Sequence, residues 1–192
     1  AVLGDKGGRA WRLAEAFGAA PVAWTDGGTP ELIIVDSAEA ASGAAGRMRR
    51  YLEGGGAMLG LSQPVGAVWP LGESGVVVRD LRGHQFVSRK TGHPVVEGLD
   101  EFHFNLWYDE KRGRIAHLMH GYLESEGEGL RPITLTGTGL WYSQRRMLPA
   151  GVELTVGTGR VILDQVYAAE RMTGEPRAAA YLERVLRYLV GE

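Results

Sequence analysis

The chain has 192 residues, of which 44% are hydrophobic and 23% charged, and its formal net charge is −2. This composition is typical of a soluble globular protein with its own core, and the even balance of charges argues against nucleic acid or an anionic membrane surface as a partner. No apolar run approaches the roughly 18 residues of a membrane-spanning helix. Cysteine is absent, which excludes disulfides and thiol chemistry and leaves the compartment open, with a cytoplasmic location favoured.

The first third of the chain alternates strand-like and helix-like segments. Short apolar runs predict strands, and apolar residues at helical spacing predict helices. In chain order these are a strand at 1–3, a helix at 9–17, strands at 21–24 and 32–35, a helix at 38–53 and a strand at 57–61. The aliphatic run Leu32–Val35 is typical of a strand buried on both faces. This order predicts an α/β fold with a mostly parallel sheet and helices on both faces.

The middle of the chain has a different pattern, which predicts an inserted antiparallel β region at about 71–150. The predicted elements are a hairpin of 76–78 with 85–87, a loop with a helical turn at 93–99, an extended aromatic segment at 102–108, and strands at 133–136 and 140–142. The end of the chain returns to the core pattern, with strands at 152–156 and 160–166 and a closing helix at 176–190. We expect a single domain over 1–192, and the start inside a strand predicts a fragment of a longer polypeptide.

The strand at 57–61 is followed by the turn Gly60-Leu61-Ser62-Gln63-Pro64. It is close to the G-x-S-x-G nucleophile elbow, with proline replacing the last glycine, and it lies at the carboxyl end of a strand, where ligands and nucleophiles usually sit. A serine nucleophile also needs a base that an acid orients. The possible bases are His84, His93, His103, His117 and His120. The alternative is a turn serine that satisfies backbone groups.

Three other patterns could carry a ligand. His117 and His120 would share a face only if their segment were helical, and no acidic residue lies between them, so we predict no metal site. The loop Gly4-Asp5-Lys6-Gly7-Gly8-Arg9 lies where a phosphate-binding loop would, but it matches no such motif and Asp5 would repel phosphate, so we predict a tight turn and no cofactor. Trp107, Tyr108, Asp109 and Trp141 could form a sugar-binding platform, or they could be core or interface residues.

Three segments together give a resemblance to a known family. They are 31–36 with Tyr51-Leu52-Glu53-Gly54-Gly55-Gly56-Ala57-Met58-Leu59-Gly60-Leu61-Ser62-Gln63, His93-Pro94-Val95-Val96-Glu97-Gly98-Leu99 leading to 105–109, and 159–166 with the closing helix. In this order they resemble the class I glutamine amidotransferase-like, flavodoxin-like fold. The likeness is to the non-catalytic version found as an accessory domain in multidomain glycoside hydrolases such as β-galactosidase-type enzymes.

The resemblance implies a lost active site. Active members of the family place a cysteine in the elbow and a His-Pro-Glu-like triplet after the last core strand. Ser62 stands at the cysteine position, Tyr167 at the histidine position and Ala169 at the acid position, with Glu170 adjacent if the register slips by one. A tyrosine with a pKa near 10 is a poor base at neutral pH.

We therefore expect a non-catalytic domain that packs on other domains or subunits of a parent glycoside hydrolase, or supports oligomer contacts. Carbohydrate is a possible further ligand. Two alternatives are a serine-dependent hydrolase of small esters or amides that uses Ser62, and a sugar-binding module that uses Trp107, Tyr108 and Trp141.

Overall fold

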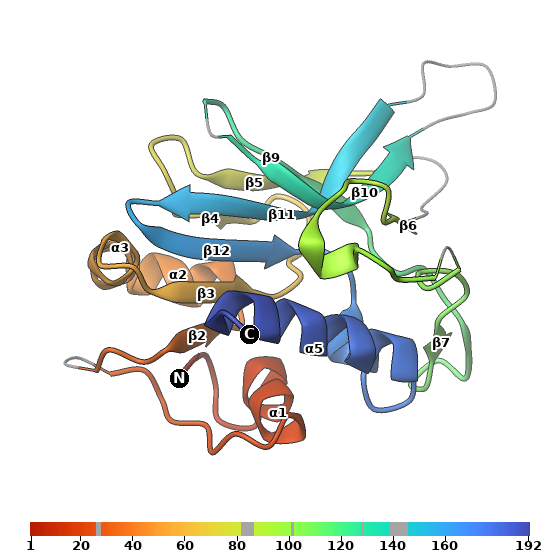
Figure 1. Cartoon of the computed structure of the whole chain (residues 1–192), viewed down its shortest axis with the longest axis horizontal. Coiled ribbons are helices and arrows are strands. Elements are labelled where there is room, and N and C mark those ends of the chain that lie inside the picture. Colours follow the sequence, from red (N-terminus) through yellow and green to blue (C-terminus); the bar gives the residue numbers. More distant parts are fainter. Residues whose placement is uncertain (26–27, 82–86, 101, 128, 139–145) are drawn as a thin grey trace.

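The computed structural model describes residues 1–25, 28–81, 87–100, 102–127, 129–138 and 146–192. Its largest element is a seven-stranded sheet (Figure 1). The strands, in their order across this sheet, are β1 (Val2–Leu3), β2 (Leu32–Val35), β3 (Ala57–Gly60), β12 (Gly159–Asp164), β11 (Arg146–Val156), β10 (Arg131–Thr138) and β6 (Val87–Ser88).

The sheet is parallel in one half and antiparallel in the other. β1, β2, β3 and β12 run parallel to one another, whereas β11, β10 and β6 are each antiparallel to their neighbours. A tight turn at Gly157 and Thr158, with Gly157 at a φ of 61°, joins β11 directly to β12, and a connection this short forces an antiparallel pair. The prediction of an α/β fold is confirmed, but the sheet is mixed rather than mostly parallel.

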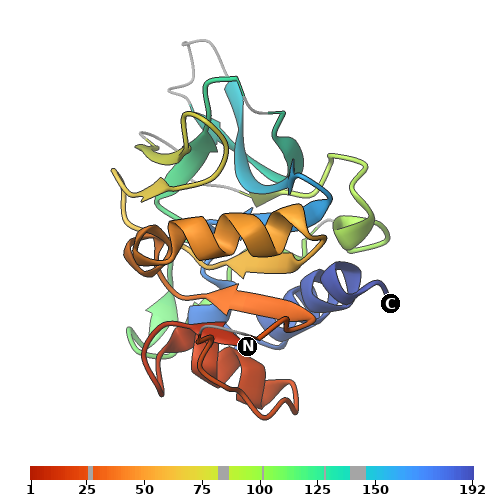
Figure 2. The ribbon, with the colours of Figure 1, turned by 90° about the vertical axis from the view of Figure 1, so that its left-hand side faces the viewer.

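Helices cover both faces of the sheet (Figures 1 and 2). They are α1 (Arg9–Ala16), α2 (Ala38–Gly43), α3 (Ala45–Glu53), α4 (Ala168–Arg171) and α5 (Pro176–Val190), with a 3₁₀ turn, η1, at Pro94–Val96. Buried residues of α1 and α5 share one hydrophobic cluster, and those of α2 and α3 share the other. The strands between them are therefore buried on both faces, as their unbroken aliphatic runs predict.

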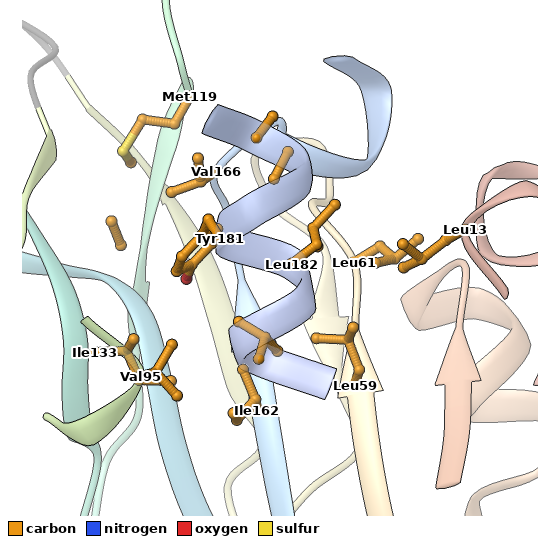
Figure 3. Packing of buried hydrophobic residues seen from close by; sticks show 14 of the residues in the cluster. Leu13, Leu59, Leu61, Val95, Met119, Ile133, Ile162, Val166, Tyr181 and Leu182 are labelled. Carbon is orange, nitrogen blue, oxygen red and sulfur yellow. The ribbon is translucent and has the colours of Figure 1, made fainter. Parts of the chain in front are cut away.

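Alternation along the strands divides the core into these two clusters. Ile34, Leu59 and Ile162 point towards α1 and α5, and the residues next to them in the chain point towards α2 and α3. Figure 3 shows Leu182 of α5 and Leu59 of β3 in the first of these clusters. Each such side chain contributes about 1.5–3 kcal/mol by its burial, so α5 is a principal source of stability.

A smaller antiparallel sheet contains β4 (Val68–Trp69), β5 (Val76–Asp80) and β9 (Gly121–Glu124). A two-stranded hairpin, β7 (Tyr108–Asp109) with β8 (Arg114–Ile115), stands apart from both sheets. The fully buried Trp69 and Leu123 join the small sheet to the α2–α3 side of the core. An antiparallel β region is thus present between β3 and β10, as the sequence predicts.

Several of the elements predicted from the sequence were wrong. Of the hairpin predicted from 76–78 and 85–87, β5 pairs with β4 and β9, whereas Val87, the described residue of the second segment, lies in β6 beside β10. These described residues therefore do not pair with each other. Residues 102–107 form turns instead of an extended strand, and 21–24 contributes only the bridge between Val2 and Ala23. The helix predicted at 38–53 is broken at Ala44, whose φ of −115° is not helical. The strand predicted at 140–142 lies outside the described residues.

Candidate functional site

Ser62 lies two residues beyond the end of β3, at the carboxyl edge of the parallel strands, and is 5% exposed. The strand must end in glycine here, because a Cβ on Gly60 would lie 2.6 Å from the Leu163 side chain and 2.8 Å from that of Trp69. The Leu61 amide then donates to the Val35 carbonyl at 3.1 Å, which ties the turn to β2. Ser62 is therefore held at the edge where the sequence places a nucleophile.

The Arg9 guanidinium reaches Ser62 from the first turn of α1. Its Nη1 donates to Ser62 Oγ at 3.0 Å and to the Ser62 carbonyl at 3.1 Å, and it also pairs with Glu170. Its Nε donates to Asp36 Oδ1 at 3.0 Å, and its Nη2 donates to the Asp36 carbonyl at 2.7 Å. One guanidinium thus holds a hydroxyl, two carboxylates and two backbone carbonyls.

Glu170 completes this arrangement. Ser62 Oγ donates to Glu170 Oε1 at 2.5 Å, so the serine hydroxyl accepts from Arg9 and donates to a carboxylate at the same time. We call Arg9, Asp36, Ser62 and Glu170 the arginine cluster. Arg9 follows β1, Asp36 follows β2, Ser62 follows β3, and Glu170 lies on α4 after β12. The cluster therefore joins the carboxyl ends of all four parallel strands.

The two glutamines beside the cluster occupy the backbone groups of the turn. The Gln63 amide donates to Gln165 Oε1 at 3.1 Å. The Gln63 side chain donates to the carbonyls of Asp36, Leu61 and Ser62 and accepts from the Ala38 amide at 3.0 Å. In a nucleophile elbow the amide after the serine helps to form the oxyanion hole. Here that amide already has a partner inside the protein.

The histidines of the described segments make their contacts elsewhere, and none of them hydrogen-bonds to Ser62. His93 Nε2 lies 3.1 Å from Glu153 Oε2, and burial lowers the His93 pKa. His103 Nε2 lies 2.9 Å from the Arg177 carbonyl. His84 lies outside the described residues. The described part of the structure therefore gives Ser62 no imidazole base.

The family resemblance named Tyr167 and Ala169 for the other two positions of the triad. Tyr167 immediately precedes α4, its ring lies 5.5 Å from that of His120, and burial raises its pKa. Ala169 packs against the α5 side of the core. The carboxylate that reaches Ser62 belongs instead to Glu170, the residue adjacent to the expected position.

The proposed aromatic platform is not assembled in the described residues. Trp107 is fully buried, and its indole Nε1 donates to the His103 carbonyl at 2.6 Å, so neither face of the ring is open to a sugar. Tyr108 is 44% exposed, and Asp109 faces Arg112 and Arg171, each at 3.7 Å. Trp141 lies outside the described residues. Among the predicted contact residues that the structure describes, Tyr108 alone places a large part of its surface in solvent.

The described residues contain no group of three or more side chains that could hold a metal ion. The rings of His117 and His120 lie 5.8 Å apart in an irregular segment between β8 and β9. Among the described helices, none has the length and apolar character needed to cross a membrane.

Sequence reasoning did not find Arg9 or Asp36 as partners of Ser62. Arg9 lies at the end of a glycine-rich loop, and Asp36 directly follows the aliphatic run of β2. The available signal was their position, since both follow parallel strands whose carboxyl ends meet at one edge of the sheet. That signal does not show that one arginine would span the whole edge.

The fold belongs to the mixed α/β class, and comparison with known proteins shows its likeness to solved structures. No family model matches the sequence, and no curated protein matches it. The cytoplasmic protein STM3548 from Salmonella typhimurium is 8% identical, with a TM-score of 0.54 over 94% of this chain and 85% of that one. A β-galactosidase from Rahnella sp. R3 is 13% identical, with a TM-score of 0.50 over 94% of this chain.

The matches differ in how much of the other protein's chain they cover. This chain spans 26% of the β-galactosidase chain. An exo-β-1,4-mannosidase from Opitutaceae bacterium strain TAV5 is 13% identical with a TM-score of 0.48, and 30% of its chain is covered. At such identities the likeness to STM3548 and to the β-galactosidase shows a shared fold alone. The fold therefore occurs both as nearly all of one protein and as a minor part of a larger enzyme.

Proposed function

We propose that this chain is a non-catalytic accessory domain of a carbohydrate-active enzyme, a glycoside hydrolase, with a class I glutamine amidotransferase-like, flavodoxin-like ancestry. Its role is structural, in packing on other domains or subunits of the parent protein. The observation that carries the proposal is the arginine cluster, which fills the edge of the sheet where that family keeps its active site.

The chemistry of the cluster opposes nucleophilic attack. A serine attacks when its hydroxyl proton passes to a base and its oxygen faces the substrate. The Ser62 proton points to Glu170, and the Ser62 oxygen accepts from Arg9, so both sides of the hydroxyl are engaged. The Gln63 amide is also engaged, and the serine is nearly buried. Catalysis would require several of these bonds to break together.

The carbohydrate part of the proposal has separate support. The β-galactosidase from Rahnella sp. R3 contains this fold within a chain about four times as long, so in that protein the fold is one part of a glycoside hydrolase. The sequence segments 31–63, 93–109 and 159–190 favour the same setting through their family resemblance. The single domain at 1–192, with its β-rich insertion at about 71–150, would then be one domain of a longer polypeptide.

Covalent labelling tests whether Ser62 acts as a nucleophile. The chain is incubated with a serine-reactive fluorophosphonate, and peptide mapping by mass spectrometry locates any adduct, with a known serine hydrolase labelled in parallel. We expect no adduct at Ser62 in the native chain. Stoichiometric labelling of Ser62, together with ester, amide or glutamine hydrolysis that Ser62→Ala abolishes, would refute the proposal in favour of a serine-dependent hydrolase.

The length and content of the complete reading frame test the accessory role. We expect the reading frame to extend beyond residues 1–192 and to encode a barrel of alternating strands and helices with paired catalytic carboxylates. Glycosidase activity of the full gene product that survives Ser62→Ala would support the proposal. A reading frame that encodes this chain alone would contradict it.

A further inference from the structure

A cavity of about 470 Å³ lies beside the β7–β8 hairpin, in a part of the chain that supplies no member of the arginine cluster. Its polar lining comes from Asn105, Arg112, Arg114 and His117, and its apolar lining includes Leu106 and Ile115. The volume is within the range of about 300–1,000 Å³ that is usual for small-molecule sites.

The charged side chains that line this cavity are all basic. Its lining contains two arginines and a histidine but no carboxylate. The nearby Asp109 faces Arg171 and Arg112, and Arg114 has no ion-pair partner among the described residues. Burial lowers the pKa of His120, and the nearby Arg112 and Arg171 lower it further. The cavity is therefore a favourable place for an anion.

The backbone at the cavity is strained in a way that presents an apolar side chain. Leu106 is the one described non-glycine residue with a positive φ, 53°, and its side chain is 68% exposed. Arg177 of α5 fixes the turn by donating from Nη1 to the Asn105 carbonyl at 2.9 Å and from Nη2 to the Leu106 carbonyl at 3.4 Å. Ile115, on the same cavity, is 55% exposed. Strained residues that neighbouring structure holds in place are typical of ligand sites.

We propose that this cavity binds an acidic sugar. Its carboxylate or phosphate group pairs with the guanidinium groups of Arg112 and Arg114, a match that suits the planar fork of arginine. The apolar C–H face of the sugar ring covers Leu106 and Ile115, and the Asn105 amide meets a hydroxyl. That the ligand is an anion is inferred from the cavity alone, whereas the choice of a sugar rests on the proposed function.

A titration of the whole chain followed by ¹H–¹⁵N NMR tests the proposal. The probes are glucuronate, glucose 6-phosphate, neutral glucose and inorganic phosphate, each at constant ionic strength. We expect at least one of the two acidic sugars to shift the amides of 105–118 with a Kd of about 1 mM, and glucose to leave them unchanged. Which of the two binds identifies the anionic group.

Two variants make the test specific. Arg114→Gln is expected to weaken binding at least about tenfold, because a hydrogen-bonded charged group is lost, while Arg49→Gln on α3 leaves it unchanged. Shifts at 105–118 that are absent with both acidic sugars, or that Arg114→Gln does not alter, overturn the proposal. Inorganic phosphate binding as tightly as the sugars overturns it too. None of these results depends on Ser62 labelling or on the length of the gene.

Discussion

The Asp164 carboxyl group, at the end of β12, is 4% exposed and lies beneath α5. Its Oδ1 accepts from the Val166 amide at 3.0 Å. A Cβ added to Gly151 would lie 3.2 Å from this oxygen, 2.9 Å from Thr134 Oγ1 and 3.5 Å from the Tyr181 hydroxyl, so three polar side chains surround this glycine in the core. No cation pairs with Asp164 among the described residues, which makes its ionised form costly.

Burial raises the pKa of Asp164 from its ordinary value of 3.8 to about 7, against the opposing hydrogen bond from Val166. Because the folded-state pKa lies above the unfolded-state value, the unfolded chain loses this proton first as the pH rises. The contribution of Asp164 to stability is therefore most favourable below about pH 4, falls between about pH 4 and 7, and is constant above that. At about 1.4 kcal/mol per pKa unit, the whole change is about 4 kcal/mol.

The substitution Asp164→Asn removes the titration while it keeps the shape of the side chain. Urea unfolding between about pH 4.5 and 7.5 should show the wild type losing about 3 kcal/mol relative to this variant. Asp5→Asn, on the exposed loop after β1, is the control and should follow the wild type. A difference between wild type and Asp164→Asn that stays constant over this range would refute the reasoning.

Three further substitutions test the packing and the site. Arg9→Gln should lower the free energy of unfolding by about 1–2 kcal/mol, because it leaves the carboxylates of Asp36 and Glu170 unpaired. The loss is moderate because both carboxylates are partly exposed, and an unchanged urea midpoint would contradict the prediction. Gly159→Ala should cost about 3 kcal/mol or more, because its methyl group would lie 2.3 Å from the Leu52 carbonyl oxygen. Gly43→Ala, at the end of α2 with open space around it, should stabilise by up to about 1 kcal/mol, so thermal melts of these two glycine variants should shift in opposite directions.

The elements with strong local signals could be predicted from the sequence. The aliphatic run of β2, the glycine stop after α3 and the broad apolar face of α5 each determine their own structure, and all three are present. The partners of the middle strands could not be predicted, because pairing depends on contacts distant in the chain. β5 pairs with β9, more than 40 residues later in the sequence, and β6 pairs with β10, which is also more than 40 residues later. Local periodicity contains no information on such choices.

The candidate site shows the same limit at the level of side chains. The turn at Ser62 is visible in the sequence, because glycine, an apolar run and a polar turn are neighbours there. Its partners Arg9 and Glu170 are 53 and 108 residues away from it. The assignment of the acid position also depends on the alignment register, because a shift of one residue along α4 replaces Ala169 with Glu170. A short helix of four residues gives too little periodicity to fix that step.

The arginine cluster explains how this edge of the sheet is ordered by groups from within the chain. In a parallel sheet this edge consists of loops whose backbone groups need partners, and an active site often leaves some of them for a ligand. Here Arg9 and Gln63 supply those partners from within the chain, through the carbonyls of Asp36, Leu61 and Ser62. The serine is then one member of a hydrogen-bonded cluster that joins four loops, and its hydroxyl bonds to both Arg9 and Glu170. Ser62→Ala should therefore reduce stability by about 1 kcal/mol and alter no turnover, a pairing that urea unfolding and hydrolysis assays on one preparation can check.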